Sequence, residues 1–258
     1  MSLVQTARKA LPRALYPSSL LRRLVQHHTG FQVVGGPFKG MRYIDRSVWG
    51  AYIPKLLGTY ELELHQSLER AIADGHQHMV DVGGAEGYYA VGLLFRMPTS
   101  GLTVFEQLAD ARSAIRELAD RNAVASRLDI QGSCSPEALQ RSMSKTGATL
   151  VLCDVEGYEQ ELLDPTKVPA LLGADLLVEV HDAQVRGVSD QLLERFGSTH
   201  ECLRITQSSR SLANYPYRDV ATRVWPAAVL KYGLNEFRSP ENGWLWLRSK
   251  QRAARAAH

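Results

Sequence analysis

The stretch MVDVGGAEGYYAVGL, from Met79 to Leu93, decides the fold. It begins as a short apolar run containing Asp81, opens into a glycine-rich turn, and resumes as an apolar pattern with helical spacing. A tight turn with positive φ needs only one glycine. Gly83, Gly84 and Gly87, with an aspartate at the end of the preceding strand, exceed that need. The stretch therefore predicts a strand, a turn whose backbone approaches a ligand closely, and a helix.

The sequence on both sides of this stretch alternates between strand-like and helix-like segments. Such alternation predicts βαβ units, and hence an α/β fold with a Rossmann-like, doubly wound, mainly parallel sheet and helices on both faces. Strand-like segments near the C-terminus, Cys202–Thr206 and residues 243–249, predict that an antiparallel C-terminal strand completes the sheet. The predicted parallel strands are 78–83, 102–106, 127–131, 149–154 and 174–181, and the predicted helices are 59–74, 87–95, 108–122, 135–142 and 158–163.

Composition narrows the class of protein. Of the 258 residues, 45% are hydrophobic and 22% are charged, which is typical of a globular protein with a full core. No apolar run approaches the roughly 20 residues of a membrane span, and no signal-peptide pattern begins the chain. The three widely spaced cysteines favour neither a disulfide framework nor a cysteine metal site. These features predict a cytoplasmic protein without a membrane span.

A dinucleotide site is the first alternative for the glycine turn. Its fingerprint, counted from Gly83, requires further glycines at positions occupied by Ala85 and Tyr88, so the pattern is absent. An acid, Glu106, nevertheless ends the next predicted strand, 19 residues after Gly87. A carboxylate there can accept hydrogen bonds from both hydroxyls of a ribose. The spacing therefore favours a nucleoside ligand without a pyrophosphate.

This combination resembles the class I S-adenosylmethionine-dependent methyltransferases. Five segments within residues 58–182, GTYELEL, VDVGGAEGYYAVGL, VFEQ, LCDVEGYE and LVEVHD, occur in the order seen in the FkbM-type branch of that superfamily. The resemblance implies S-adenosyl-L-methionine as the cofactor. Many family members have Ala-Asn where this chain has Gly84-Ala85, which places one side-chain polar contact in question and leaves the backbone argument unaffected.

The resemblance also implies roles for individual residues. Asp81 and Gly83 would lie near the methionine part of the cofactor, Glu106 would bind the ribose, and Glu61, before the first strand, would help to hold the amino end. Residues after the third strand would lie near the adenine. The predicted cofactor-binding set is Glu61, Asp81, Gly83, Gly84, Ala85, Gly87, Tyr88, Glu106, Gln107, Gly132, Ser133 and Asp154.

Methyl transfer to a hydroxyl requires alignment of the acceptor and removal of a proton. Asp154 ends one predicted strand, with Glu156 in the following turn, and the alternation in Glu179-Val-His181 points both polar side chains to one face of another. Asp154, Glu179 and His181 are therefore the predicted catalytic group, with His181 as first choice of base. Two other interpretations stay open: a divalent-metal site, for example for Mg²⁺, formed by the same three residues, and a buried charge pair that shapes the pocket.

The chain is expected to contain an N-terminal helical and hairpin cap at 1–57, a methyltransferase domain at 58–250 and a basic tail at 251–258. The cap prediction rests on helical spacing in 3–28 and on a turn signal within Phe31–Ile44.

The predicted activity is O-methylation of a small molecule or sugar. A non-catalytic nucleoside-binding or scaffold protein is one alternative. An RNA methyltransferase is another, and it would use the basic N-terminal residues Arg8, Lys9 and Arg13, although the basic residues are too sparse for nucleic acid to be the expected partner. The sequence leaves a homodimer open.

Overall fold

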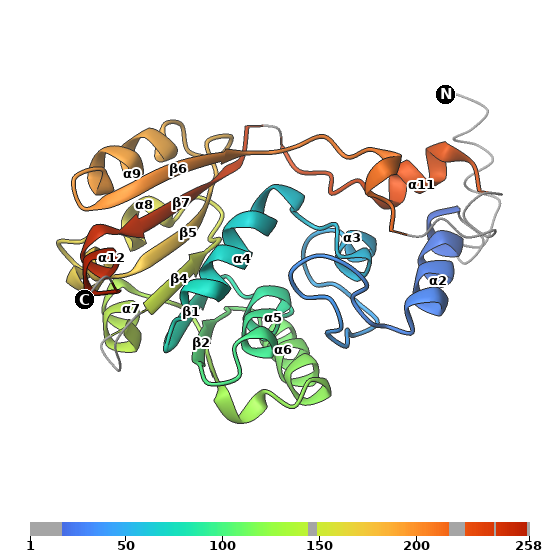
Figure 1. The fold of residues 1–258 in the computed structure, drawn as a ribbon, viewed down its shortest axis with the longest axis horizontal. Helices are drawn as coiled ribbons and strands as arrows, with labels where there is room; N and C mark the ends of the chain where they lie inside the picture. The colour runs from blue at the N-terminus through green and yellow to red at the C-terminus, as the bar shows by residue number, and fades with distance from the viewer. Residues whose placement is uncertain (1–16, 144–148, 217–224, 240, 257–258) are drawn as a thin grey trace. The chain divides into compact units, whose positions relative to one another are not determined.

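The computed structural model describes residues 17–143, 149–216, 225–239 and 241–256 (Figure 1). The chain divides into two compact units. The N-terminal unit comprises residues up to Tyr60 together with 209–237, and the sheet unit comprises 61–208 and the residues from Arg238 onward. The sequence prediction placed 209–237 in the methyltransferase domain, whereas the structure groups this segment with the N-terminal residues.

The sheet unit is built on a sheet that has seven strands within the described residues, in the order β3-β2-β1-β4-β5-β7-β6. The first five strands pair in parallel, and β7 pairs antiparallel with both β5 and β6. The predicted mainly parallel sheet with an antiparallel C-terminal strand is confirmed. The strands are β1 (His78–Val82), β2 (Gly101–Phe105), β3 (Leu128–Gln131), β4 (Thr149–Cys153), β5 (Asp175–Val180), β6 (His200–Thr206) and β7 (Gly243–Ser249).

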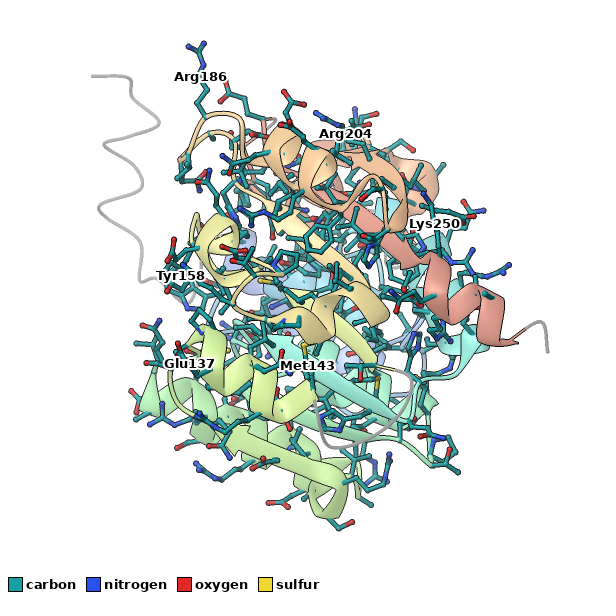
Figure 2. The ribbon with its side chains drawn as sticks, turned by 90° about the vertical axis from the view of Figure 1, so that its left-hand side faces the viewer. Glu137, Met143, Tyr158, Arg186, Arg204 and Lys250 are labelled. Atoms are coloured by element: carbon teal, nitrogen blue, oxygen red, sulfur yellow. The ribbon has the colours of Figure 1, made fainter. Side chains whose placement is uncertain are left out.

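Helices cover both faces of this sheet. On one face, Leu139, Leu162 and Leu192 of α7, α8 and α9 join Val151 and Val178 in a continuous apolar cluster. Figure 2 views this side, with Glu137 and Met143 labelled near the two ends of α7. Helices α4, α5 and α6 lie on the opposite face (Figure 1). The helices are α4 (His65–Asp74), α5 (Tyr88–Arg96), α6 (Ala109–Arg121), α7 (Pro136–Met143), α8 (Glu159–Leu162), α9 (Val188–Phe196) and α12 (Lys250–Ala256), with short 3₁₀ turns η2 (Leu62–Leu64), η3 (Ala125–Arg127) and η4 (Pro169–Gly173).

The strand order places a switch point between β1 and β4. From β1 the chain moves outward to β2 and β3, and then returns to place β4 on the other side of β1. Ligands of open α/β sheets bind beyond the carboxyl ends of the strands at such a point. Gly83 follows β1 and Asp154 follows β4, so both predicted site segments lie there.

The N-terminal unit contains α2 (Pro17–Thr29), α3 (Tyr52–Leu57), η5 (Leu212–Asn214) and α11 (Ala227–Gly233). Helix α2 packs against α3 and α11. The expected hairpin reduces to a single antiparallel bridge between Gln32 and Arg42, because successive turns fill the residues between them. Of the two helices predicted in 3–28, the first lies outside the described residues, as do Arg8, Lys9 and Arg13.

The predicted basic tail begins inside a helix, α12. Arg252 of α12 forms an ion pair with the buried Asp175, and it also donates a hydrogen bond of 2.8 Å to the carbonyl oxygen of Asp74. These contacts anchor the helix to the sheet unit. Within the part of the chain that the structure describes, none of the helices is both long and apolar enough to cross a membrane.

Candidate functional site

The turn between β1 and α5 is closed by backbone contacts. The N–H groups of Gly83 and Gly84 donate to the carbonyl oxygen of Phe105, over 2.9 and 3.2 Å. Gly83 has φ of +89°, and a Cβ atom there would lie 1.8 Å from the carbonyl oxygen of Asp154. Only glycine fits this approach. Gly83 therefore allows the ends of β1 and β4 to pack together, a role that is independent of any ligand.

Glu106 connects this turn to the end of β2. Glu106 is 8% exposed, and its two carboxylate oxygens accept hydrogen bonds from the N–H groups of Ala85 (2.9 Å) and Leu108 (2.8 Å). Each carboxylate oxygen has two acceptor positions. The side chain is thus held in place by the backbone while it keeps capacity for further donors.

Asp81 lies at the end of β1 and is only 1% exposed. Neither of its carboxylate oxygens accepts a well-formed hydrogen bond from the described residues. Burial, followed by the charge of the nearby Glu106, raises the pKa of Asp81 to about 7, and the backbone N–H of Ala90 partly opposes the shift. A buried carboxyl group without a well-formed hydrogen bond costs free energy, so this position is suited to a ligand that brings a donor.

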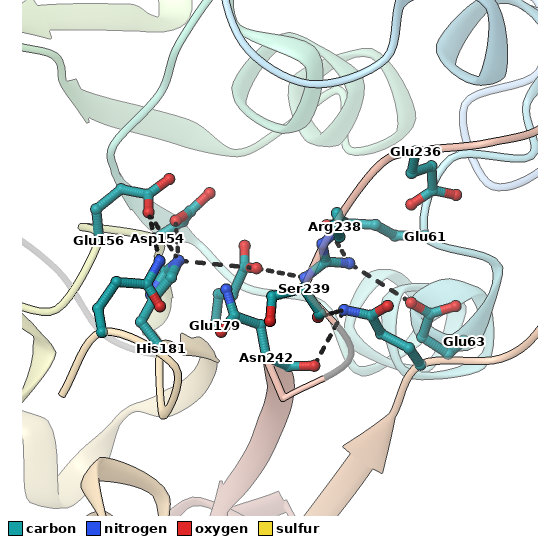
Figure 3. A network of polar contacts seen from close by, with 12 residues as sticks. Glu61, Glu63, Asp154, Glu156, Glu179, His181, Glu236, Arg238, Ser239 and Asn242 are labelled. Atoms are coloured by element: carbon teal, nitrogen blue, oxygen red, sulfur yellow. Dashed lines mark hydrogen bonds and ion pairs between the residues drawn. The ribbon is translucent and has the colours of Figure 1, made fainter. Parts of the chain in front are cut away.

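A second set of acids surrounds one arginine, as Figure 3 shows. We name Glu61, Glu63, Glu179 and Arg238 the Arg238 cluster. Nη1 of Arg238 lies 2.8 Å from Glu61 and 3.5 Å from Glu63, and Nη2 contacts Glu179. Glu61 also accepts a hydrogen bond from the hydroxyl of Tyr89. Glu61 and Arg238 are the first residues of the two chain segments that make up the sheet unit, so their ion pair joins the beginnings of these two segments.

His181 follows β5 and is almost fully buried. Its Nδ1 atom lies 2.6 Å from Glu159, and its Nε2 atom faces Glu156 at 3.4 Å, Asp154 at 3.5 Å and Glu179 at 3.8 Å. Burial lowers the pKa of His181, but the Glu159 hydrogen bond and the charges of Glu179 and Asp154 outweigh it and raise the pKa to about 9. The surrounding carboxylates therefore favour the protonated form of the imidazole.

Asp154 shares this environment. Burial, followed by the charge of Glu179, raises its pKa well above the usual range for an aspartate, and His181 only partly opposes the shift. Among the residues that the structure describes, the acids around His181 thus outnumber the cations that can balance them. Such a site attracts protons or a cation.

Comparison with known proteins gives likenesses in structure only. No family model matches the chain, and no curated protein matches it in sequence. A precorrin-6y C5,15-methyltransferase from Geobacter metallireducens is 11% identical over 72% of this chain and 89% of its own, with a TM-score of 0.48. The O-methyltransferase TomG from Streptomyces achromogenes, solved in complex with SAM, is 13% identical over 70% and 77%, with a TM-score of 0.47. An rRNA methylase from Streptococcus thermophilus is 11% identical over 72% and 96%, with a TM-score of 0.49.

Because these identities and TM-scores are low, the fold assignment rests on the strand order of the chain itself. That order brings most of the predicted site segments to one edge of the sheet. The glycine turn and Glu106 lie together, as do Asp154 and His181. Gln107, Gly132 and Ser133 are exposed at the ends of β2 and β3. Which of these residues bind a cofactor stays a prediction.

Three residues of the site were not predicted as functional: Glu156, Glu159 and Arg238. The first two belong to LCDVEGYE, a segment that the sequence did single out, but only Asp154 of that segment was chosen. Arg238 carries no local signal, because its three partners are distant in sequence. The structure brings the predicted trio together, since Nε2 of His181 lies 3.5 Å from Asp154 and 3.8 Å from Glu179. Glu156 lies slightly nearer to the same nitrogen, at 3.4 Å, and Glu179 also pairs with Arg238.

Proposed function

We propose that the chain is an S-adenosylmethionine-dependent methyltransferase that acts on a hydroxyl of a small molecule or sugar. The observation that carries the proposal is the pair of buried acids, Asp81 and Glu106, on the two sides of a glycine turn at the switch point of the sheet. Dinucleotide-binding sheets use the same turn for a pyrophosphate. Here the turn is lined by carboxylates, which suit hydroxyl and ammonium groups and repel phosphates.

The residues present fit the polar groups of S-adenosylmethionine. Glu106 retains acceptor capacity for the ribose hydroxyls. The carboxylate oxygens of Asp81 accept no well-formed hydrogen bond within the described part of the chain, and an amino group would supply one. Glu61 is the second acid for the amino end, and it contacts Tyr89 and Arg238. The exposed backbone at Gly132 and Ser133 is available to the adenine. When bound, the cofactor supplies an electrophilic methyl group.

The chain's own residues would then orient the acceptor and accept its proton. His181 is fixed through Nδ1 by Glu159, so Nε2 is directed toward Asp154 and Glu156. A hydroxyl placed there would meet acceptors for its proton within one group of side chains. Glu179, paired with Arg238, would shape the adjoining wall. The FkbM-type branch, the hydroxyl acceptor and a cytoplasmic location remain predictions of the sequence, which leaves a homodimer open.

Thermal unfolding with and without ligand tests this function. S-adenosylhomocysteine at about 100 times its Kd should stabilise the protein by about 2.7 kcal/mol, since a ligand that binds only the folded state shifts unfolding by mass action. We therefore expect the melting temperature to rise by several degrees, whereas NAD at the same concentration should leave it unchanged. Stabilisation by NAD without stabilisation by S-adenosylhomocysteine would favour a dinucleotide site and contradict the proposal.

A further inference from the structure

We infer that Asp154, Glu156 and His181 form a binding site for a divalent transition-metal cation, with Glu159 as the residue that orients His181. This set differs from the sequence prediction, which had Glu179 in place of Glu156. The site itself stands on its own geometry. Its role in positioning an acceptor hydroxyl rests on the proposed function.

The distances around His181 are the first argument. One ligand atom from each of the three residues lies within 4.8 Å of the others. The separations of 3.4 and 3.5 Å from Nε2 to Glu156 and Asp154 exceed the roughly 2.7–2.9 Å of a charge-assisted hydrogen bond. Ligand atoms that each lie about 2.1 Å from a tetrahedral ion are about 3.4 Å apart. The two distances from Nε2 therefore match a shared cation better than direct ion pairs.

The second argument is the orientation of the imidazole. Metal-binding histidines usually donate their other ring N–H to a carboxylate, which fixes the tautomer and directs the free lone pair at the metal. Nδ1 of His181 lies 2.6 Å from Glu159, whose side chain is fully buried. The same oxygen of Glu159 accepts a hydrogen bond from the N–H of Gly157, over 3.1 Å. Glu159 is thus held rigidly, and it leaves Nε2 to face the two carboxylates.

The third argument is an unsatisfied oxygen next to Nε2. Oδ1 of Asp154 is buried and has no hydrogen-bond partner among the described residues. This is the same oxygen that lies 3.5 Å from Nε2 of His181. A buried oxygen of this kind needs a compensating contact. Arg238 is already engaged with Glu61, Glu63 and Glu179. A cation between Asp154, Glu156 and His181 would supply the missing contact.

The ligand types indicate which cation fits. One imidazole with two carboxylates is a mixed set of nitrogen and oxygen ligands. Such a set suits Mn²⁺, Fe²⁺ or Zn²⁺ better than it suits Mg²⁺, which prefers oxygen ligands alone. Three protein ligands also leave coordination positions open for a hydroxyl, whose proton a bound cation makes more acidic. Mg²⁺, the ion considered from the sequence, is therefore expected to bind more weakly than Mn²⁺.

Titration of the full chain with Mn²⁺, followed by electron paramagnetic resonance without cofactor or acceptor, tests the site. We expect one saturable site in the wild-type protein, and at least about tenfold weaker binding in Glu156→Gln, His181→Gln and Glu159→Gln. The Glu156 side chain is 71% exposed, so the first variant should fold normally. Glu161→Gln, which removes the same charge from an exposed side chain on α8, is the matched control and should bind Mn²⁺ as the wild type does.

Absence of a saturable site in the wild type would overturn the inference. So would binding that Glu156→Gln leaves intact and Glu179→Gln abolishes, because that result would assign the site to the trio predicted from the sequence. Binding of S-adenosylhomocysteine is measured separately on the same protein. A protein that binds S-adenosylhomocysteine but does not bind Mn²⁺ would overturn the metal site alone. A protein that binds Mn²⁺ but does not bind S-adenosylhomocysteine would support the metal site and overturn the proposed function.

Discussion

Replacing Arg238 with alanine is expected to lower the free energy of unfolding by about 3–5 kcal/mol, the usual cost of removing one partner from a buried ion pair. The Arg238 side chain is 12% exposed, and those of Glu61, Glu63 and Glu179 are buried. Without the guanidinium, three carboxylates would face one another with no cation between them. The substitution also removes the ion pair that joins the two points where the chain enters the sheet unit.

Urea unfolding followed by circular dichroism measures this effect. Arg204→Ala is the control, because Arg204 and its partner Asp190 are 45% and 82% exposed, and such surface pairs contribute less than about 1 kcal/mol. Combining Arg238→Ala with Glu179→Gln should recover part of the lost stability by removing one uncompensated charge. Equal effects of Arg238→Ala and Arg204→Ala would show that the Arg238 cluster does not stabilise the sheet unit.

Replacing His181 with alanine is expected to lower kcat for methyl transfer by about 10²–10⁴, the range for loss of a group that handles a proton or positions the acceptor. The affinity for S-adenosylhomocysteine should change little. His181 contacts Glu159, Asp154 and Glu156, whereas Asp81 and Glu106, the two acids on which the proposed cofactor site rests, lie at the glycine turn.

The test uses an acceptor identified by screening, with kcat and the dissociation constant of S-adenosylhomocysteine measured for each variant. His200→Ala serves as the control for loss of a buried imidazole, since Nε2 of His200 makes a structural hydrogen bond of 2.9 Å with the carbonyl oxygen of Ala174. It should lower stability and leave kcat near the wild-type value. Equal losses of turnover and nucleoside affinity in His181→Ala would refute a role for His181 in the chemical step.

Local patterns in the sequence predicted the sheet well. The parallel strands begin and end within about one residue of their predicted bounds, because apolar runs and glycine punctuation identify buried strands directly. The antiparallel strand β7 was likewise visible in its own sequence. The grouping of 209–237 with the N-terminal unit was not predictable, because it depends on packing of α11 against α2, which are distant in sequence.

The site was predicted only in part, because several of its contacts also join residues that are distant in sequence. Alternation along β5 correctly placed Glu179 and His181 on one side, but it could not show that Arg238 engages Glu179. Nor could spacing show that Glu156 turns toward His181, since that contact depends on the meeting of two loops. At Gly83 the structure provides a reason that the sequence did not show. The glycine pattern was interpreted as a sign of a ligand, whereas the backbone of Asp154 by itself leaves no room for a Cβ atom at this position.

The most direct test of the central claim is calorimetric titration of the protein with S-adenosylhomocysteine, alongside Glu106→Ala and Asp110→Ala. Asp110 is an exposed acid in the first turn of α6, so its variant removes the same charge near the same strand end. We predict micromolar binding by the wild type and by Asp110→Ala. Glu106→Ala should lose about 1.5–3 kcal/mol of binding free energy, the value of hydrogen bonds to a charged group, or roughly 10- to 150-fold in affinity.

Glu106 also accepts hydrogen bonds from Ala85 and Leu108, so a Glu106→Gln variant, which keeps one acceptor oxygen, is measured beside the alanine variant to separate loss of the turn from loss of the ligand contact. Weakened binding in a Glu106→Gln protein that melts like the wild type is the result that the account predicts. No binding by folded wild-type protein, or binding by Glu106→Ala that is as tight as that of the wild type, would contradict it.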